Sequence, residues 1–366
     1  MLTDLRLFQF KKFKDESIEL FPLTLLTGIN GMGKSSVIQA LLVLRQSFDR
    51  GELQNNRNLV IEDKELTNLI SPDDMLNADA ESTDVSITIE DDNIGSATWK
   101  VRAEGKSNTL PLVDNVQNEM YVISLFSTTF QYLKAERIGP RATYDRLTVT
   151  RRHSPIGYSG EFVANRILEA ANQLEEVQLE KVKIEGQSSK VYDLLSYWMS
   201  EILYPDSKVV LGSSDASKID LEYTFKNQPT KKFNPLNIGF GFSYVLPVIL
   251  AILTSKPGSL LLVENPEAHL HPRGQSRMGH LLALAAESGL QIIVETHSDH
   301  LLNGIRVAIK QKKLGSNKTQ IHFFTEEFKD TNKQSFAIEE DGSLERWPKG
   351  FFDEWDNMLT ELLKDS

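Results

Sequence analysis

The stretch "PLTLLTGINGMGKSSVIQALLVLRQ", residues 22–46, decides the fold. Its apolar run at 23–26 is typical of a buried strand, and the apolar residues after 36 recur at helical spacing. Between them lies the pattern Gly-x4-Gly-Lys-Ser, residues 28–35. A strand, a glycine-rich loop and a helix in this order predict a loop that binds phosphate groups.

The residue types of this loop suit phosphate chemistry. Glycines let successive backbone N–H groups turn toward phosphate oxygens, and the helix N-terminus adds partial positive charge. We expect Lys34 to reach the β- and γ-phosphates of a nucleotide and the Ser35 hydroxyl to ligate Mg²⁺. The expected nucleotide contacts here are Gly28, Asn30, Gly31, Gly33, Lys34, Ser35 and Ser36. A chance glycine turn is the alternative, which the flanking strand and helix disfavour.

Composition limits the possible functions. The chain has 366 residues, 40% of them hydrophobic, and a formal net charge of −11. Such a surface repels nucleic acid as a whole, so DNA contact requires a local basic patch. No cysteine is present, which excludes disulfides, zinc–thiolate sites and a thiol nucleophile. Because no apolar signal core or membrane span is recognisable, we expect a cytoplasmic protein without membrane contact.

Three downstream segments complete a nucleotide site. "GFGFS", residues 239–243, is a glycine turn before an apolar helix. "SLLLVENPEAHLHP", residues 259–272, carries a buried strand that ends in Glu264. "QIIVETHS", residues 291–298, is another strand, and His297 follows it at the edge where α/β folds place ligand contacts.

Together with the phosphate loop, this order resembles the ABC-type ATPase heads of the SMC, RecF and overcoming-lysogenisation-defect group. The resemblance implies a P-loop NTPase with an α/β fold of the ABC/SMC-head type: a mixed sheet core, an antiparallel β subdomain and a helical lobe. It also implies ATP and Mg²⁺ as cofactors, with Glu264 and Ser35 on the metal side and His297 at the γ-phosphate. In such heads, the segment matching Gly239, Gly241 and Ser243 binds the γ-phosphate of ATP held by another subunit. A plain glycine turn with Ser243 as the helix N-cap is the alternative.

The position after Glu264, where such enzymes carry the carboxylate that activates water, is Asn265. An amide can orient water but cannot accept its proton at neutral pH. Glu267 is the nearest spare carboxylate, and we expect it to act as general base after a sharp turn at Pro266. An ordinary loop ion pair is the alternative for Glu267. Hydrolysis is therefore predicted to be slow.

Other clusters admit several interpretations. His269 and His271 have the spacing of strand metal ligands, but without cysteine a zinc site is disfavoured. A basic segment contains Arg137, Arg141, Arg146, Arg151 and Arg152. It is interpreted either as a γ-phosphate sensor between the lobes, as a basic patch for DNA or an acidic partner, or as a solvated loop. The ending "WPKGFFDEW", 347–355, is either a docked aromatic face or a partner-binding element.

Four parts are expected along the chain: an N-terminal ATPase lobe (1–160), a helical insertion (161–215), a C-terminal ATPase lobe (216–330) and an acidic aromatic tail (331–366). The predicted function is an ATPase that forms a homodimer or higher oligomer around ATP-Mg. It gates a separate effector protein, nuclease-like or toxin-like, in bacterial antiviral defence. The alternatives are a RecF-like DNA-binding repair ATPase and an ATP-binding scaffold with negligible turnover.

Overall fold

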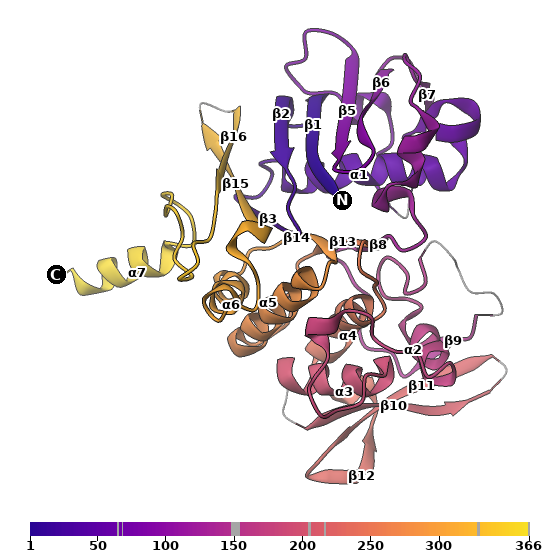
Figure 1. Cartoon of the computed structure of the whole chain (residues 1–366), viewed down its shortest axis with the longest axis vertical. Coiled ribbons are helices and arrows are strands. Elements are labelled where there is room, and N and C mark those ends of the chain that lie inside the picture. Colours follow the sequence, from indigo (N-terminus) through magenta and orange to yellow (C-terminus); the bar gives the residue numbers. More distant parts are fainter. Residues whose placement is uncertain are drawn as a thin grey trace.

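A six-stranded sheet forms the centre of the molecule (Figure 1). The computed structural model describes residues 1–63, 66–67, 69–147, 154–203, 206–215, 217–327 and 330–364. The strand order is β16-β15-β3-β14-β13-β8, in which only the edge strand β16 runs antiparallel to its neighbour. The bounds are β3 (Leu23–Gly28), β8 (Gln131–Leu133), β13 (Leu260–Glu264), β14 (Gln291–Glu295), β15 (Thr319–Glu327) and β16 (Asp330–Phe336).

Both faces of this sheet are buried, which explains why its strands are apolar without alternation. Successive side chains of a strand point to opposite faces. Along β13, Leu261 and Val263 pack into one hydrophobic cluster, and Leu260 and Leu262 pack into another. The first cluster contains α5 (Pro272–Glu287) and α6 (Asp299–Lys310), and the second contains α1 (Lys34–Asp49).

An antiparallel sheet with order β2-β1-β5-β6 covers the other side of α1 (Figure 1). Its strands are β1 (Leu2–Phe10), β2 (Phe13–Glu19), β5 (Asp84–Asp91) and β6 (Gly95–Arg102). β5 and β6 form an antiparallel hairpin. A small pair, β4 (Asn58–Val60) and β7 (Thr109–Pro111), lies next to this subdomain.

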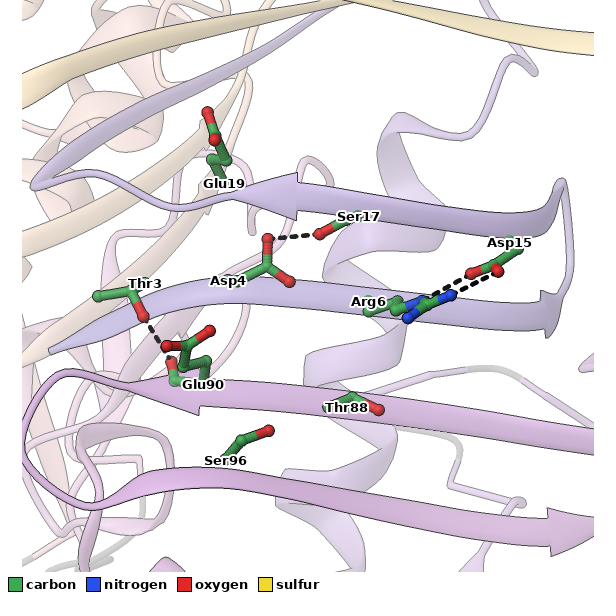
Figure 2. A pocket seen from close by; sticks show the side chains of 9 residues that line it. All are labelled: Thr3, Asp4, Arg6, Asp15, Ser17, Glu19, Thr88, Glu90 and Ser96. Atoms are coloured by element: carbon green, nitrogen blue, oxygen red, sulfur yellow. Dashed lines mark hydrogen bonds and ion pairs between the residues drawn. The ribbon is translucent and has the colours of Figure 1, made fainter.

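The outer face of the antiparallel sheet is polar (Figure 2). Arg6 donates to both carboxylate oxygens of Asp15, at 2.8 and 2.6 Å, and Ser17 donates to Asp4. Glu19 and Glu90 lie on the same face. The inward residues of these strands are apolar, so the alternation expected of a half-exposed antiparallel sheet is present.

A helical lobe lies on the side of the core sheet away from the antiparallel sheet (Figure 1). It contains α2 (Val163–Asn172), α3 (Val191–Ile202) and α4 (Phe240–Leu253), with a sheet formed by β9 (Thr143–Asp145), β10 (Ser207–Ser214), β11 (Lys218–Phe225) and β12 (Gln228–Phe233). The segment expected to be a helical insertion thus ends in a strand, and its residues 173–190 contain no α-helix. The expected mixed sheet core, antiparallel subdomain and helical lobe are all present.

The chain ends in an aromatic segment and α7 (Glu354–Leu363). Phe351 is fully buried, and its ring lies 5.1 Å from Phe323 and 4.9 Å from Phe336. By contrast, Leu362 and Leu363 of α7 are 82% and 72% exposed, and the helix extends away from the core (Figure 1). The aromatic segment therefore docks on the head, whereas the end of the helix does not. β16 pairs with β15 and so belongs to the core sheet rather than to a separate tail.

Among the described residues, no helix is long and apolar enough to cross a membrane.

The packing of α5 on α6 depends on glycine. A Cβ at Gly304 would lie 2.0 Å from the backbone oxygen of Ser276. Alanine normally stabilises a helix interior by about 1 kcal/mol relative to glycine. We expect Gly304→Ala to lower the free energy of unfolding instead, by about 1–3 kcal/mol, because the helices must separate. Urea denaturation measures this change.

The matched control is Val307→Ala on the same helix, where the side chain is 49% exposed. It should change the free energy of unfolding by no more than about 0.5 kcal/mol. A stabilised Gly304→Ala protein would contradict the close helix contact.

Candidate nucleotide-binding site

The predicted site residues converge at one edge of the core sheet. β3, β14 and β13 are parallel, so their carboxyl ends lie at the same edge. β3 ends at Gly28, β14 at Glu295 and β13 at Glu264, and the Cα atoms of the two glutamates are register partners. Open α/β sheets bind ligands at the carboxyl ends of their strands.

The glycine-rich loop connects β3 to α1, and two of its glycines are required by space. A Cβ at Gly28 would lie 2.0 Å from the Phe324 carbonyl oxygen, and Gly28 has φ of 124°. A Cβ at Gly33 would lie 2.7 Å from the Phe13 ring, and Gly33 has φ of 105° at the N-cap of α1. Gly31 also has positive φ, in open space. The loop therefore needs glycine for conformation and for close packing.

Lys34 is the first residue of α1, and its ammonium group stays at the loop. Nζ donates to the carbonyl oxygens of Gly28 and Ile29, both at 2.9 Å. These bonds use two of its three N–H donors. The side chain is only 3% exposed, and burial lowers the pKa of Lys34. A buried ammonium group beside a helix N-terminus is well placed to attract a phosphate oxygen.

The Ser35 hydroxyl lies 3.2 and 3.1 Å from the two carboxylate oxygens of Glu295. Glu295 is 7% exposed. Burial, together with the neighbouring charge of Glu264, raises the pKa of Glu295 to about 7. The sequence analysis missed this residue, although "LLLVE" and "QIIVE" are two apolar strands with the same ending, which places both carboxylates at one edge.

Glu264 is half-buried and has partners for both oxygens. Oε1 accepts a hydrogen bond from the Tyr132 hydroxyl at 2.8 Å, and Oε2 accepts one from the Ala135 N–H at 3.2 Å. Burial and, to a smaller extent, the charge of Glu264 raise the pKa of Tyr132, so this hydroxyl stays protonated as a donor. Glu264 is thus oriented from β8 and the segment after it.

Asn265 begins a turn whose backbone is bound by Arg137. Asn265 has φ of 44°, a left-handed conformation that asparagine tolerates, and its Oδ1 is buried without a partner among the described residues. Arg137 is 2% exposed and donates to the carbonyl oxygens of Glu264 at 2.9 Å and Asn265 at 2.5 Å. Burial lowers the pKa of Arg137 to about 10.

Of the expected basic cluster, Arg137 is therefore a buried anchor and neither a solvated loop residue nor part of a basic patch. Arg141 is exposed, and Arg146 donates to the carbonyl oxygen of Asp215 at 2.9 Å. Arg151 and Arg152 lie outside the described residues.

Glu267 follows the turn and is buried, with 8% exposure. Its Oε1 accepts a hydrogen bond from the His297 backbone N–H at 2.9 Å, and Oε2 has no partner among the described residues. Burial raises the pKa of Glu267. The ring of His297 is exposed, and partial burial followed by the charge of Lys34 lowers its pKa. The turn at Pro266 thus places the Glu267 carboxylate against the backbone of His297.

The glycine turn at residues 239–243, expected to bind the γ-phosphate held by another subunit, differs from the prediction at Ser243. α4 begins at Phe240 with Gly239 as its N-cap, so Ser243 lies inside the first turn and is 5% exposed. The N-cap alternative for Ser243 is therefore wrong, and its hydroxyl does not lie on the surface. Phe240 is 56% exposed at the tip, and a Cβ at Gly241 would lie 2.8 Å from the His269 carbonyl oxygen.

The two histidines of "AHLHP" have other partners among the described residues. The His269 ring packs against Tyr244 at 4.4 Å and Phe240 at 5.8 Å. His271 caps α5, where its Nδ1 accepts a hydrogen bond from the Arg273 N–H. In the part of the chain that the structure describes, no three His, Asp or Glu residues are grouped to hold a metal by themselves.

An open pocket brings the loop residues together with Glu295. Six of the predicted nucleotide contacts line it: Asn30, Gly31, Gly33, Lys34, Ser35 and Ser36. Lys11 and Lys12 line the same pocket from the turn between β1 and β2. Sequence reasoning missed these two lysines, because only the fold brings residues 11–12 to residues 30–36. Gly239, Gly241 and Ser243 do not line this pocket.

Comparison with solved structures identifies the fold. The crystal structure of the SmcHead bound to the C-winged helix domain of ScpA is 14% identical, with a TM-score of 0.54, and the match covers 92% of this chain and 98% of that one. The Smc head domain with an extended coiled coil, bound to the C-terminal domain of ScpA derived from Pyrococcus furiosus, is 13% identical with a TM-score of 0.55 over 99% of both chains. The fold is that of an SMC-type P-loop ATPase head.

The family follows from the sequence match. A family described as "AAA domain, putative AbiEii toxin, Type IV TA system" matches residues 23–303, and the chain belongs to this family of ATPase domains. A second family, described as "Protein of unknown function (DUF3696)", matches residues 314–362. No curated protein is similar to the chain.

The anchoring role of Arg137 can be tested by its removal. Arg137→Met leaves the carbonyl oxygens of Glu264 and Asn265 buried without this donor, and each such group costs about 1–3 kcal/mol. We expect the free energy of unfolding to fall by at least about 2 kcal/mol. Chemical denaturation with Arg141→Met as the exposed control measures the difference; equal stability of both variants would refute the anchoring role.

Proposed function

We propose that this protein binds ATP with Mg²⁺ and hydrolyses it slowly, and that two copies associate around the nucleotide to control a separate effector protein. One observation carries the proposal: Lys34 and Ser35 open α1 beside Glu295, in the pocket that the glycine-rich loop lines. The phosphate groups of a nucleoside triphosphate suit this pocket, because backbone N–H groups, a helix N-terminus and an ammonium group all favour bound phosphate.

The residues of this edge also fit Mg²⁺. Nucleotide-bound Mg²⁺ keeps several waters and takes few protein ligands besides phosphate oxygens, so no large cluster of carboxylates is required. The Ser35 hydroxyl and the carboxylates at the ends of β13 and β14 are the hard oxygen donors that this ion prefers. Bound Mg²⁺ would neutralise charge on the β- and γ-phosphates.

Slow hydrolysis follows from the amide at Asn265. General base catalysis typically contributes a factor of about 10²–10⁴, and an amide cannot supply it. Glu267 is our candidate base: burial raises its pKa, which makes the carboxylate a stronger base, and one of its oxygens has no hydrogen-bond partner among the described residues. His297 lies next to it and is the candidate contact of the γ-phosphate.

Association of two copies is proposed from the resemblance to SMC heads together with the exposed tip of α4. The turn at Gly239 and Phe240 is on the surface, away from the pocket of its own protomer. Its backbone N–H groups at a helix N-terminus suit a phosphate held by a second copy. Because Ser243 is buried, Gly239 and Phe240 carry the proposed contact, with Gly241 allowing close packing on the His269 loop.

The effector and its role in antiviral defence are proposed from the resemblance to related ATPase heads. The matched family description names a toxin of a type IV toxin–antitoxin system, and the similar SMC heads are described as bound to ScpA. A nuclease-like or toxin-like partner that responds to the nucleotide state is proposed by analogy with the binding of a separate protein by those heads. RecF-like DNA binding is disfavoured because the outer face of the antiparallel sheet, with Asp4, Glu19 and Glu90, is acidic and repels DNA phosphates (Figure 2).

ATP binding should depend on Lys34. Lys34→Ala removes charge-assisted hydrogen bonds that each contribute about 1.5–3 kcal/mol, so we expect binding to fall below detection by isothermal titration calorimetry. Lys256→Ala, at an exposed position outside the pocket, is the control with unchanged affinity. If Lys34→Ala bound ATP as tightly as the wild type, the phosphate-loop assignment would fail.

Turnover should respond in opposite directions to two substitutions. Asn265→Glu supplies a carboxylate at the end of β13 and should raise kcat at least several-fold, whereas Glu267→Gln should lower kcat about tenfold or more with unchanged ATP affinity. Glu136→Gln, at an exposed position, is the control. Phosphate release measures kcat. No effect of Glu267→Gln would exclude it as the base, and no turnover in any protein would favour the scaffold alternative.

A further inference from the structure

We propose that Glu295, at the end of β14, is a magnesium-binding carboxylate of this protein and acts together with Ser35. The inference deepens the proposed function and rests on it. It moves the main metal-side role from Glu264, where the resemblance places it, to a residue on the neighbouring strand.

The first observation is the position of the serine. Both carboxylate oxygens of Glu295 lie within 3.2 Å of the Ser35 hydroxyl. The hydroxyl has one hydrogen, so it donates to one carboxylate oxygen at a time, and both groups keep lone pairs that can bind a cation. Both residues line the pocket of the glycine-rich loop, whereas Glu264 does not.

The second observation concerns the hydrogen-bond partners of Glu264. Its two oxygens accept hydrogen bonds from the Tyr132 hydroxyl and the Ala135 N–H, at 2.8 and 3.2 Å. These donors come from β8 and the residues after it, on the side of the sheet edge away from the loop. Glu264 is therefore a weaker candidate for direct contact with a metal ion at Ser35.

The third observation is the electrostatic environment. Glu295 is 7% exposed, and its register partner is Glu264. Burying one carboxylate next to another is costly, because desolvation and like charge both oppose the ionised state. The nearest buried cation, Lys34, donates to the loop carbonyls of Gly28 and Ile29. A divalent cation between Ser35 and Glu295 would offset this cost, which gives a physical reason for the pair.

The test compares ATP-analogue affinity with Mg²⁺ and with EDTA, by isothermal titration calorimetry using a non-hydrolysable analogue. We expect wild type to bind more tightly with Mg²⁺, and Glu295→Gln to lose at least tenfold of that enhancement while keeping its affinity in EDTA. Glu264→Gln should lose less, and Glu136→Gln nothing. Glu295→Asp, which keeps the charge, should retain part of the enhancement and serves if the amide variant does not fold.

Full enhancement in both Glu295 variants, or a larger loss in Glu264→Gln, would overturn the inference and leave the proposed function standing. Equal affinity of the wild type with Mg²⁺ and with EDTA would overturn it as well. Absence of any binding by folded wild-type protein would overturn the proposed function, and the inference with it.

Discussion

The parallel pairing of β3, β14 and β13 is the constraint on which the rest of the structure depends. Because these strands run in the same direction, the glycine-rich loop, Glu295 and Glu264 emerge at one edge although they are far apart in the sequence. The pairing requires that both faces of the sheet be covered, which the helices and the antiparallel sheet do. The close approach of Gly28 to the Phe324 carbonyl oxygen then fixes the start of the loop against β15.

Charge is concentrated at this edge. Glu264 and Glu295 end adjacent strands, and the buried ammonium group of Lys34 acts on Glu295. A second buried cation, Arg137, donates to the carbonyl oxygens of Glu264 and Asn265. Arg137 thus stabilises the left-handed turn at Asn265, whose residues do not line the pocket of the glycine-rich loop. The same turn brings Glu267 to the His297 backbone, so the end of β13 and the end of β14 are joined by a hydrogen bond as well as by strand pairing.

Much of this arrangement could be predicted from sequence. The phosphate loop has a short local pattern, and the strands at 260–264 and 291–295 are apolar runs with polar endings, so the fold class was correctly inferred. Six of the predicted loop residues line one pocket together with Glu295. Contacts between distant segments could not be read in this way: Lys11 reaches the pocket through a turn in another sheet. Ser243 was misplaced because the helix begins three residues earlier, at Phe240, and helix ends are weakly specified by a glycine-rich segment.

The central claim is that the pocket of one copy is completed by the α4 tip of another when ATP is bound. Sedimentation velocity with ATP and Mg²⁺ tests it most directly, using wild type, Lys34→Ala and Gly239→Arg. A Cβ at Gly239 would meet no other atom within 4 Å, and the residue has an ordinary φ of −60°, so arginine can be placed there without disturbing the fold. The account predicts that wild type dimerises only with ATP, that neither variant dimerises alone, and that their mixture forms dimers through the one intact composite site. A wild-type protein that stays monomeric at saturating ATP, or a Gly239→Arg protein that dimerises as wild type does, would contradict it.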